Sequence, residues 1–179
     1  MKKLFLLKVL ATLVVTVAML YPLIRQASNE NGGTGVFASL ESIGLVGSSA
    51  IVTLFILGVA FYCRSLQKCL SLIKPVCQTM NPKMVWLMFV PFYNIVEDFF
   101  IIYNVTRSLE QEAQSNERLK ELSSFGKVSG FGWCIAQVIS LFPSMLGEIA
   151  SLIALVFWVA HWRSISKTNY LLSIAVLDV

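Results

Sequence analysis

The sequence is poor in charge. Asp, Glu, Lys and Arg make up only 13% of its 179 residues, whereas an ordinary soluble domain has about 25%. Hydrophobic residues make up 56%, and the mean hydropathy is +0.74. A soluble protein of this size cannot bury so much apolar surface, because small domains keep a large surface relative to their volume. The shortage of charge therefore excludes an ordinary soluble globule and predicts a single all-α membrane domain, residues 1–179.

The sequence also lacks the motifs of common catalytic and cofactor sites. It contains no GxSxG, HExxH, G-x-G-x-x-G or P-loop pattern. The single histidine, His161, has no second histidine with which to bind a metal, and the four cysteines do not have zinc or redox spacing. We therefore expect no catalytic, cofactor-binding or metal-binding residues, no cofactor and no enzymatic activity. No patch alternates basic with aromatic residues, so we expect no nucleic-acid partner.

Long apolar runs dominate the chain instead. A helix needs about 20 residues to cross a hydrocarbon core of about 30 Å. The run 128–163 is too long for one straight crossing and contains Pro143, so it predicts a hairpin of two short helices. Another apolar run, 84–104, predicts an interfacial or re-entrant helix, and 105–125 predicts a polar cytoplasmic helix. The predicted bundle has about four transmembrane helices, at 4–24, 43–62, 128–142 and 148–163.

Three polar residues interrupt the run 84–104. On an α-helix, Asn94 has Glu97 and Asp98 as neighbours one turn away. An Asp at the bilayer centre costs about 2.5–3.5 kcal/mol, and carboxylates at that depth suggest a proton or cation pathway. Asn94, Glu97 and Asp98 are therefore the candidate residues of an ion or proton path. The alternative is a structural acidic pair that meets Lys or Arg from the loop 63–83.

The positions of the basic residues predict the topology. Lys8 lies inside the first span and is expected to extend toward the headgroups. If segment 84–104 does not cross, twelve of the other thirteen Lys and Arg residues lie inside and only Arg25 lies outside. If it crosses, the division is six to seven with the hairpin, or eight to five with one long last span. The positive-inside rule favours the first topology, with both termini cytoplasmic.

One segment resembles a group of known proteins. Residues 81–94, NPKMVWLMFVPFYN, match the pattern V-W-L-x-x-(I/V)-P-x-x-N, which resembles that of small bacterial multi-pass membrane proteins of uncharacterised function. A polar helix and a glycine-led apolar pair follow, so the resemblance covers residues 81–163. It implies an origin in the bacterial inner membrane. It implies no mechanism, and no functional residue is carried over from it.

These observations favour a protein that acts by interaction in the inner membrane, as a scaffold or regulatory subunit of a membrane assembly. Its expected partners are the lipid bilayer and either another protein or a second copy. Small residues in 43–62 are expected to pack against another helix, and 105–127 is expected to be the cytoplasmic contact surface. The first alternative is a small oligomeric ion or proton channel or transporter that uses Asn94, Glu97 and Asp98. The second is a lipid-modifying membrane enzyme.

Overall fold

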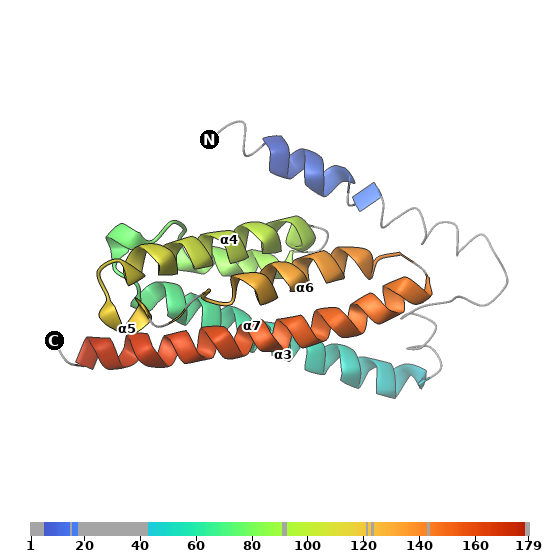
Figure 1. Ribbon diagram of the computed structural model, residues 1–179. Coiled ribbons are helices and arrows are strands. Elements are labelled where there is room, and N and C mark those ends of the chain that lie inside the picture. Colours follow the sequence, from blue (N-terminus) through green and yellow to red (C-terminus); the bar gives the residue numbers. More distant parts are fainter. Residues whose placement is uncertain are drawn as a thin grey trace.

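The described part of the chain is helical (Figure 1). The computed structural model describes residues 6–14, 16–17, 43–90, 93–120, 122, 124–142 and 144–177, and none of these residues is in a β-strand. The predicted all-α class is therefore confirmed for these residues. The elements are the N-terminal helix (residues 6–14 and 16–17), α3 (Gly44–Leu72), η1 (Pro75–Cys77), η2 (Pro82–Phe89), α4 (Tyr93–Ala113), α5 (Glu117–Lys120), α6 (Lys127–Ile139) and α7 (Met145–Leu177).

Two of the described helices, α3 and α7, are long and apolar enough to cross a membrane. They have 29 and 33 residues, and are about 44 and 50 Å long at 1.5 Å per residue, which exceeds a hydrocarbon core of about 30 Å. α6 has only 13 residues. The predicted span 4–24 lies partly outside the described residues. A bundle of four spans is therefore not confirmed by helix length.

α3 and α7 lie side by side and run in the same direction. The Tyr62 hydroxyl of α3 is 2.8 Å from Nδ1 of His161 in α7. Further along both helices, the Asn169 side-chain amide donates to the backbone carbonyl of Ser65 at 2.9 Å. From the first contact to the second, the residue number rises on both helices. The C-terminal ends of α3 and α7 therefore lie at the same end of the molecule (Figure 1).

α6 runs in the opposite direction along α7. A Cβ on Gly132 would lie 3.0 Å from the Phe157 ring, and a Cβ on Gly126 would lie 3.0 Å from the hydroxyl of Ser164. From the first contact to the second, the residue number falls on α6 and rises on α7. The two helices therefore form an antiparallel hairpin. Such close approach requires glycine, because any larger side chain separates the helices.

The second arm of this hairpin is longer than the sequence indicates. The predicted span ends at 163, but α7 continues to Leu177. Ile165 and Leu172 on this extension are fully or almost fully buried. The extension is helical because these apolar residues lie two turns apart on one face and pack into the core.

A second hairpin is formed by residues 74–113. The backbone N–H of Lys74 donates to the Glu112 carboxylate at 3.0 Å, and the Thr79 N–H donates to the Ser108 hydroxyl at 2.9 Å. η2 therefore runs along α4 in the opposite direction. The predicted helix at 84–104 is instead the 3₁₀ helix η2 followed by the first half of α4, and Pro91 of the sequence lies outside the described residues.

The predicted polar helix at 105–125 also consists of two elements. Its first nine residues extend α4 to Ala113, and the short helix α5 follows after a turn. One face of the α4 extension is buried and includes Val105 and Leu109. The segment is therefore part of the core as well as of the surface.

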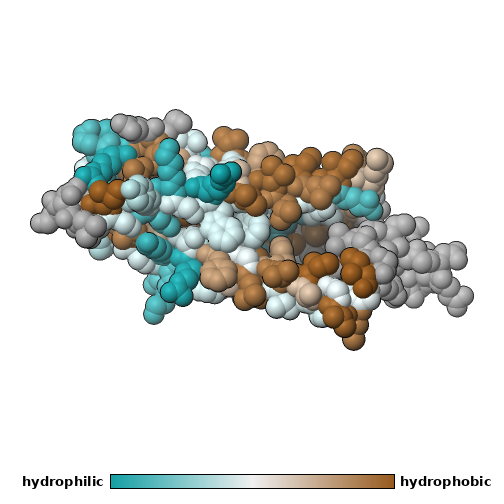
Figure 2. All heavy atoms as spheres, turned by 90° about the horizontal axis from the view of Figure 1, so that it is seen from below, coloured by the Kyte–Doolittle hydropathy of each residue, from teal (hydrophilic) through white to brown (hydrophobic). Residues whose placement is uncertain are grey.

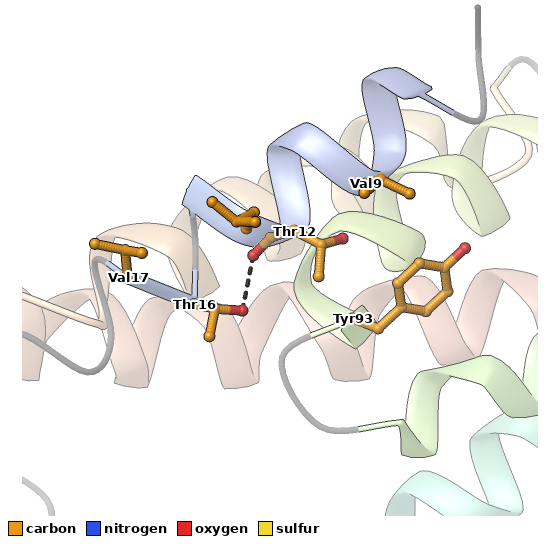
Figure 3. A pocket seen from close by; sticks show the side chains of 6 residues that line it. Val9, Thr12, Thr16, Val17 and Tyr93 are labelled. Carbon is orange, nitrogen blue, oxygen red and sulfur yellow. Dashed lines mark hydrogen bonds between the residues drawn. The ribbon is translucent and has the colours of Figure 1, made fainter.

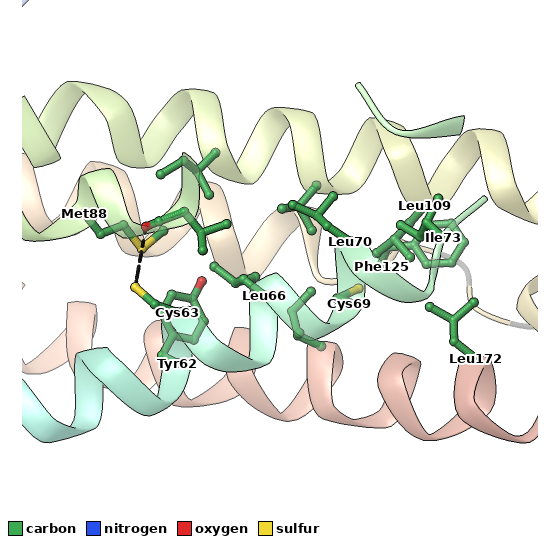
Figure 4. Close-up of a cluster of buried hydrophobic side chains, with 14 of the residues drawn as sticks. Tyr62, Cys63, Leu66, Cys69, Leu70, Ile73, Met88, Leu109, Phe125 and Leu172 are labelled. Atoms are coloured by element: carbon green, nitrogen blue, oxygen red, sulfur yellow. Dashed lines mark hydrogen bonds between the residues drawn. The ribbon is translucent and has the colours of Figure 1, made fainter. Parts of the chain in front are cut away.

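The hydrophobic core lies between the C-terminal halves of α3 and α7, the hairpin of residues 74–113 and the start of α6 (Figure 4). On α3 the buried positions recur at helical spacing, which places them on one face. The largest fully buried apolar side chains are Tyr62, Leu66, Leu70, Ile73, Ile101, Ile102, Leu109, Leu119, Ile165 and Leu172.

The surface divides into a polar end and an apolar end. We call the end that holds α5 and the C-terminus the polar end, and the opposite end the apolar end. Every described Lys and Arg except Lys8 lies toward the polar end. On the face in Figure 2, hydrophilic residues gather at one end and hydrophobic residues over the other. The exposed apolar residues of the apolar end include Leu45, Val46, Leu54, Leu57, Met145, Leu146, Leu152 and Val156.

Candidate functional site

The best-defined polar contact inside the apolar end is an ion pair. The Lys8 ammonium of the N-terminal helix lies 2.7 and 2.9 Å from the two carboxylate oxygens of Glu97 in α4. The side chains are only 15% and 2% exposed. The same ammonium lies 4.2 Å from the centre of the Phe100 ring, so a cation–π interaction adds to the pair. Lys8 therefore neutralises Glu97 inside the protein.

This pair corrects two predictions. Lys8 does not extend toward the headgroups, because its ammonium bonds Glu97. The acidic pair also does not meet a basic residue of the loop 63–83, since the partner of Glu97 comes from the N-terminal helix. The sequence separation is 89 residues, so no local pattern indicates the contact.

Asp98 lies beside Glu97 and is also buried, with 1% of its surface exposed. Among the described residues its Oδ1 atom has no hydrogen-bond partner. Burial raises the pKa of Asp98 to about 8; an interaction with the Gln137 side chain of α6 opposes this rise, and the Glu97 charge adds to it. The carboxyl group is therefore protonated at neutral pH, because an unpaired charge is expensive in a dry interior.

A third group of buried polar side chains joins α3 to α7. The Tyr62 hydroxyl and the His161 ring form the 2.8 Å hydrogen bond, and both side chains are fully buried. The Nε2 atom of His161 has no partner among the described residues. If the tyrosine donates to Nδ1, the proton of the neutral ring lies on Nε2.

Glycines of α6 make room for the His161 ring. A Cβ on Gly130 would lie 2.6 Å from Cγ2 of Ile102 and 2.8 Å from Cδ2 of His161. A Cβ on Gly126 would lie 3.0 Å from the same ring atom. Gly130 lies in the first turn of α6, and Gly126 is the residue just before this helix, with a left-handed φ of 74°. They allow α6, α4 and α7 to meet closely around the buried polar groups.

The structure separates the three candidate path residues. Glu97 and Asp98 lie in the interior, whereas Asn94 in the first turn of α4 is only half-buried. Within the described chain, no hydrogen bond joins the Asn94 side chain to either carboxylate. Sequence reasoning missed Lys8, Tyr62 and Gln137 as neighbours of this region, because their contacts are formed by distant helices.

A groove of about 360 Å³ lies beside the ion pair, between the N-terminal helix and the start of α4 (Figure 3). Thr12 and Thr16 bond backbone carbonyls of their own helix, each at 2.8 Å, so their hydroxyls are satisfied. The groove offers no acid, base or nucleophile except the Tyr93 hydroxyl. Its lining residues are Val9, Thr12, Leu13, Thr16, Val17 and Tyr93.

Two tryptophans of α7 pack against α3. Trp158 is almost fully buried beside Tyr62, and the Trp162 ring N–H donates to the Ser65 hydroxyl at 3.0 Å. Both rings therefore hold α7 against α3.

Chemically, the described site is a set of buried side chains that can carry protons. No three His, Cys, Asp or Glu side chains of the described chain are grouped so that they hold a metal ion. Comparison with family models, curated proteins and solved structures finds no match to the chain. The resemblance based on residues 81–94 therefore stays a prediction.

Proposed function

We propose that the chain is a bacterial inner-membrane protein with four spans and one re-entrant hairpin. The spans are the N-terminal segment, α3, α6 and α7, and the hairpin of residues 74–113 enters from the cytoplasmic side. The helix directions support this topology, because α3 and α7 run parallel and α6 runs antiparallel to them. The clustering of Lys and Arg at the polar end supports a cytoplasmic position for that end under the positive-inside rule.

Within this topology, the protein acts by interaction, as a scaffold or regulatory subunit of a membrane assembly. The observation that carries this proposal is the uncovered first half of α3. Leu45 and Val46 are 87% and 82% exposed, and no residue between Gly44 and Phe61 is classed as buried. A transmembrane half-helix that the described helices of the chain leave exposed is available to another helix.

One face of this half-helix is suited to close packing. Ser49 and Thr53 lie one turn apart, and both hydroxyls bond backbone oxygens of their own helix, at 2.9 and 2.7 Å. Ser49 precedes Gly58 by nine residues, which is half a turn out of phase at 100° per residue. Because Gly58 packs on Trp158, Ser49 and Thr53 point away from the chain's own bundle. Small residues on such a face let a second helix approach.

The polar end is less suited to be the contact surface than the sequence indicates. Its exposed acids are paired within the chain: Lys127 meets Glu110 at 3.3 Å, and Lys120 meets Glu117. Since these charges already form ion pairs within the chain, we place the partner on α3 within the membrane.

Co-purification after gentle solubilisation tests this function. A tagged full-length chain is expected to recover a stoichiometric partner, either a second protein or an untagged copy. Ser49→Leu is expected to reduce recovery at least tenfold, because the larger side chain separates the helices. Ala50→Leu adds similar bulk 100° around the same helix and serves as the matched control. Recovery of the bare monomer alone, or equal loss in both variants, would contradict the proposal.

A second candidate function is proton conduction by an oligomer. The specific observation in its favour is Asp98, a buried acid with an unpaired oxygen and a raised pKa. Proton flux into proteoliposomes is expected to fall strongly in Asp98→Asn and to persist in Glu110→Gln, which changes an exposed acid. Flux indistinguishable from that of empty vesicles, or unchanged by Asp98→Asn, would exclude Asp98 from such a path.

A further inference from the structure

A row of exposed side chains follows the 3₁₀ helix η2. A 3₁₀ helix has three residues per turn, so residues at i and i+3 lie directly above one another. Lys83, Trp86 and Phe89 form one such row, and all three are exposed. Val85 and Met88, in the row that faces inward, are buried. The periodicity of η2 thus separates a core row from a surface row.

The surface row is ordered along the axis of the bundle. η2 runs antiparallel to α4, starting near the polar end and leading toward the apolar end. Lys83 therefore lies nearest the polar end, and Phe89 lies nearest the apolar end. The Trp86 and Phe89 rings are stacked, with centroids 5.7 Å apart and planes 22° apart. A cation followed by aromatic rings is the order in which a membrane changes from headgroups to acyl chains.

α3 adds two cations beside this row. The Trp86 ring N–H donates to the Gln67 side-chain oxygen of α3 at 2.7 Å. Gln67 is adjacent to Lys68 and one turn after Arg64, and both basic side chains are exposed. The hydrogen bond therefore fixes the Trp86 ring beside a basic face of α3.

The segments that supply these cations carry no acidic residue of their own. The sequence has no Asp or Glu between Ser42 and Val96. Among the described residues, neither Lys83 nor the two basic residues of α3 forms an ion pair, in contrast to Lys120 and Lys127. This charge pattern favours an anionic partner that also covers the Trp86 and Phe89 rings.

We propose that Lys83, Trp86, Phe89, Arg64 and Lys68 form a binding site for an anionic phospholipid of the cytoplasmic leaflet. The phosphate lies against the three cations, Trp86 lies at the level of the glycerol, and an acyl chain covers Phe89. The site depends on residence in the membrane and is independent of the helix partner proposed for α3. It fastens the re-entrant hairpin to the lipid boundary.

Native mass spectrometry of the full chain tests the site, with phosphatidylglycerol and phosphatidylcholine added separately to the detergent-solubilised protein. Preferential retention of phosphatidylglycerol is expected. Lys83→Gln and Arg64→Gln are each expected to weaken it about fivefold, the effect of one basic residue near an anionic surface. Lys120→Gln and Lys127→Gln remove exposed cations that are already paired and are expected to leave retention unchanged.

A second readout distinguishes a lipid from a free anion. Brominated phosphatidylglycerol is expected to quench a component of the tryptophan fluorescence that Trp86→Phe removes, while inorganic phosphate does not displace the lipid. Lys83→Gln, Arg64→Gln and Trp86→Phe each change an exposed residue, and circular dichroism checks that the variants fold. Equal retention of both lipids, displacement by phosphate, or equal weakening in the Lys120→Gln and Lys127→Gln controls would overturn the proposal.

Discussion

The two ends of the bundle arrange charge in opposite ways. At the polar end the pair of Lys120 and Glu117 lies on the surface, with side chains 51% and 85% exposed. At the apolar end the pair of Lys8 and Glu97 lies inside, and the outside is apolar. The difference shows what each end is built to meet. Water solvates the charges at the polar end. Within the apolar end, an ionisable side chain is either paired with an opposite charge, as Glu97 is, or protonated and therefore neutral.

α3 passes through both environments and shows the change within one helix. Leu57 in its first half is exposed, and Leu66 in its second half is fully buried. In water, burial of a leucine stabilises the fold, but lipid is as apolar as leucine and gives no such gain. The second half of α3 therefore holds the chain's own fold together, whereas the first half, which under the proposed topology faces lipid or a partner, contributes little to it.

The largest expected effect comes from breaking the buried pair. Lys8→Met leaves the Glu97 carboxylate buried without a partner, and is expected to lower the free energy of unfolding by about 3–5 kcal/mol. Lys120→Met at the polar end is expected to cost only a few tenths of a kcal/mol, because that pair is exposed to water. Denaturant titration of the solubilised protein measures both values.

A double variant separates the pair from other effects of Lys8. Lys8→Met with Glu97→Gln removes both charges, and is expected to regain most of the stability that Lys8→Met loses. If the double variant is as unstable as the single one, the pair is not the reason for the loss. Equal costs for Lys8→Met and Lys120→Met would remove the contrast between the two ends.

The second effect compares one substitution in the two halves of α3. Leu66→Ala creates a cavity in the core and is expected to cost about 2–5 kcal/mol. Leu57→Ala on the exposed half is expected to change stability by less than about 0.5 kcal/mol. Thermal unfolding in the same detergent compares the two variants. A large loss in Leu57→Ala would mean that this half is covered after all.

Composition and periodicity were sufficient to predict the all-α class of the described residues, and the apolar runs predicted helices at 43–62 and 148–163. Both helices are longer in the structure. The extension of α7 was missed, because the run after Arg163 has mixed polarity and its burial depends on helices distant in sequence. The 3₁₀ form of η2 was missed because residues 84–90 are all apolar and show no period that separates them from α4.

The candidate site was predictable only in part. Glu97 and Asp98 stand out because carboxylates are rare in apolar runs. Their partners do not stand out, since Lys8 precedes Glu97 by 89 residues and Tyr62 precedes His161 by 99. Such contacts depend on which helices pack together, and local patterns contain no information about that packing.

The third prediction concerns the close packing around His161. Gly130→Ala places a methyl group 2.6 Å from Ile102 Cγ2, and is expected to cost about 1–3 kcal/mol, as overpacking of a core does. Gly58→Ala meets only the outer edge of the Trp158 ring at 3.0 Å, and a smaller loss is expected. Chemical denaturation ranks the two variants, and the reverse order would show that α6 and α7 can separate at little cost.

The last prediction concerns a dependence of stability on pH. The pKa of Asp98 is about 8 in the folded protein and about 3.9 in an unfolded chain. The folded state therefore binds more protons between these values, and stability falls as pH rises through this window. One group contributes at most about 1.4 kcal/mol per pH unit, and its contribution levels off above the folded pKa.

Asp98→Asn isolates this contribution, because the amide keeps the shape of the protonated acid but does not titrate. Unfolding temperatures measured from pH 5 to pH 9 (roughly the window set by the two pKa values) are expected to fall less steeply in this variant than in the parent. Glu110→Gln changes an exposed acid at the polar end and should keep the parental slope. Identical slopes in all three proteins would mean that Asp98 is ionised in the fold, and that water or a cation reaches the apolar end from outside.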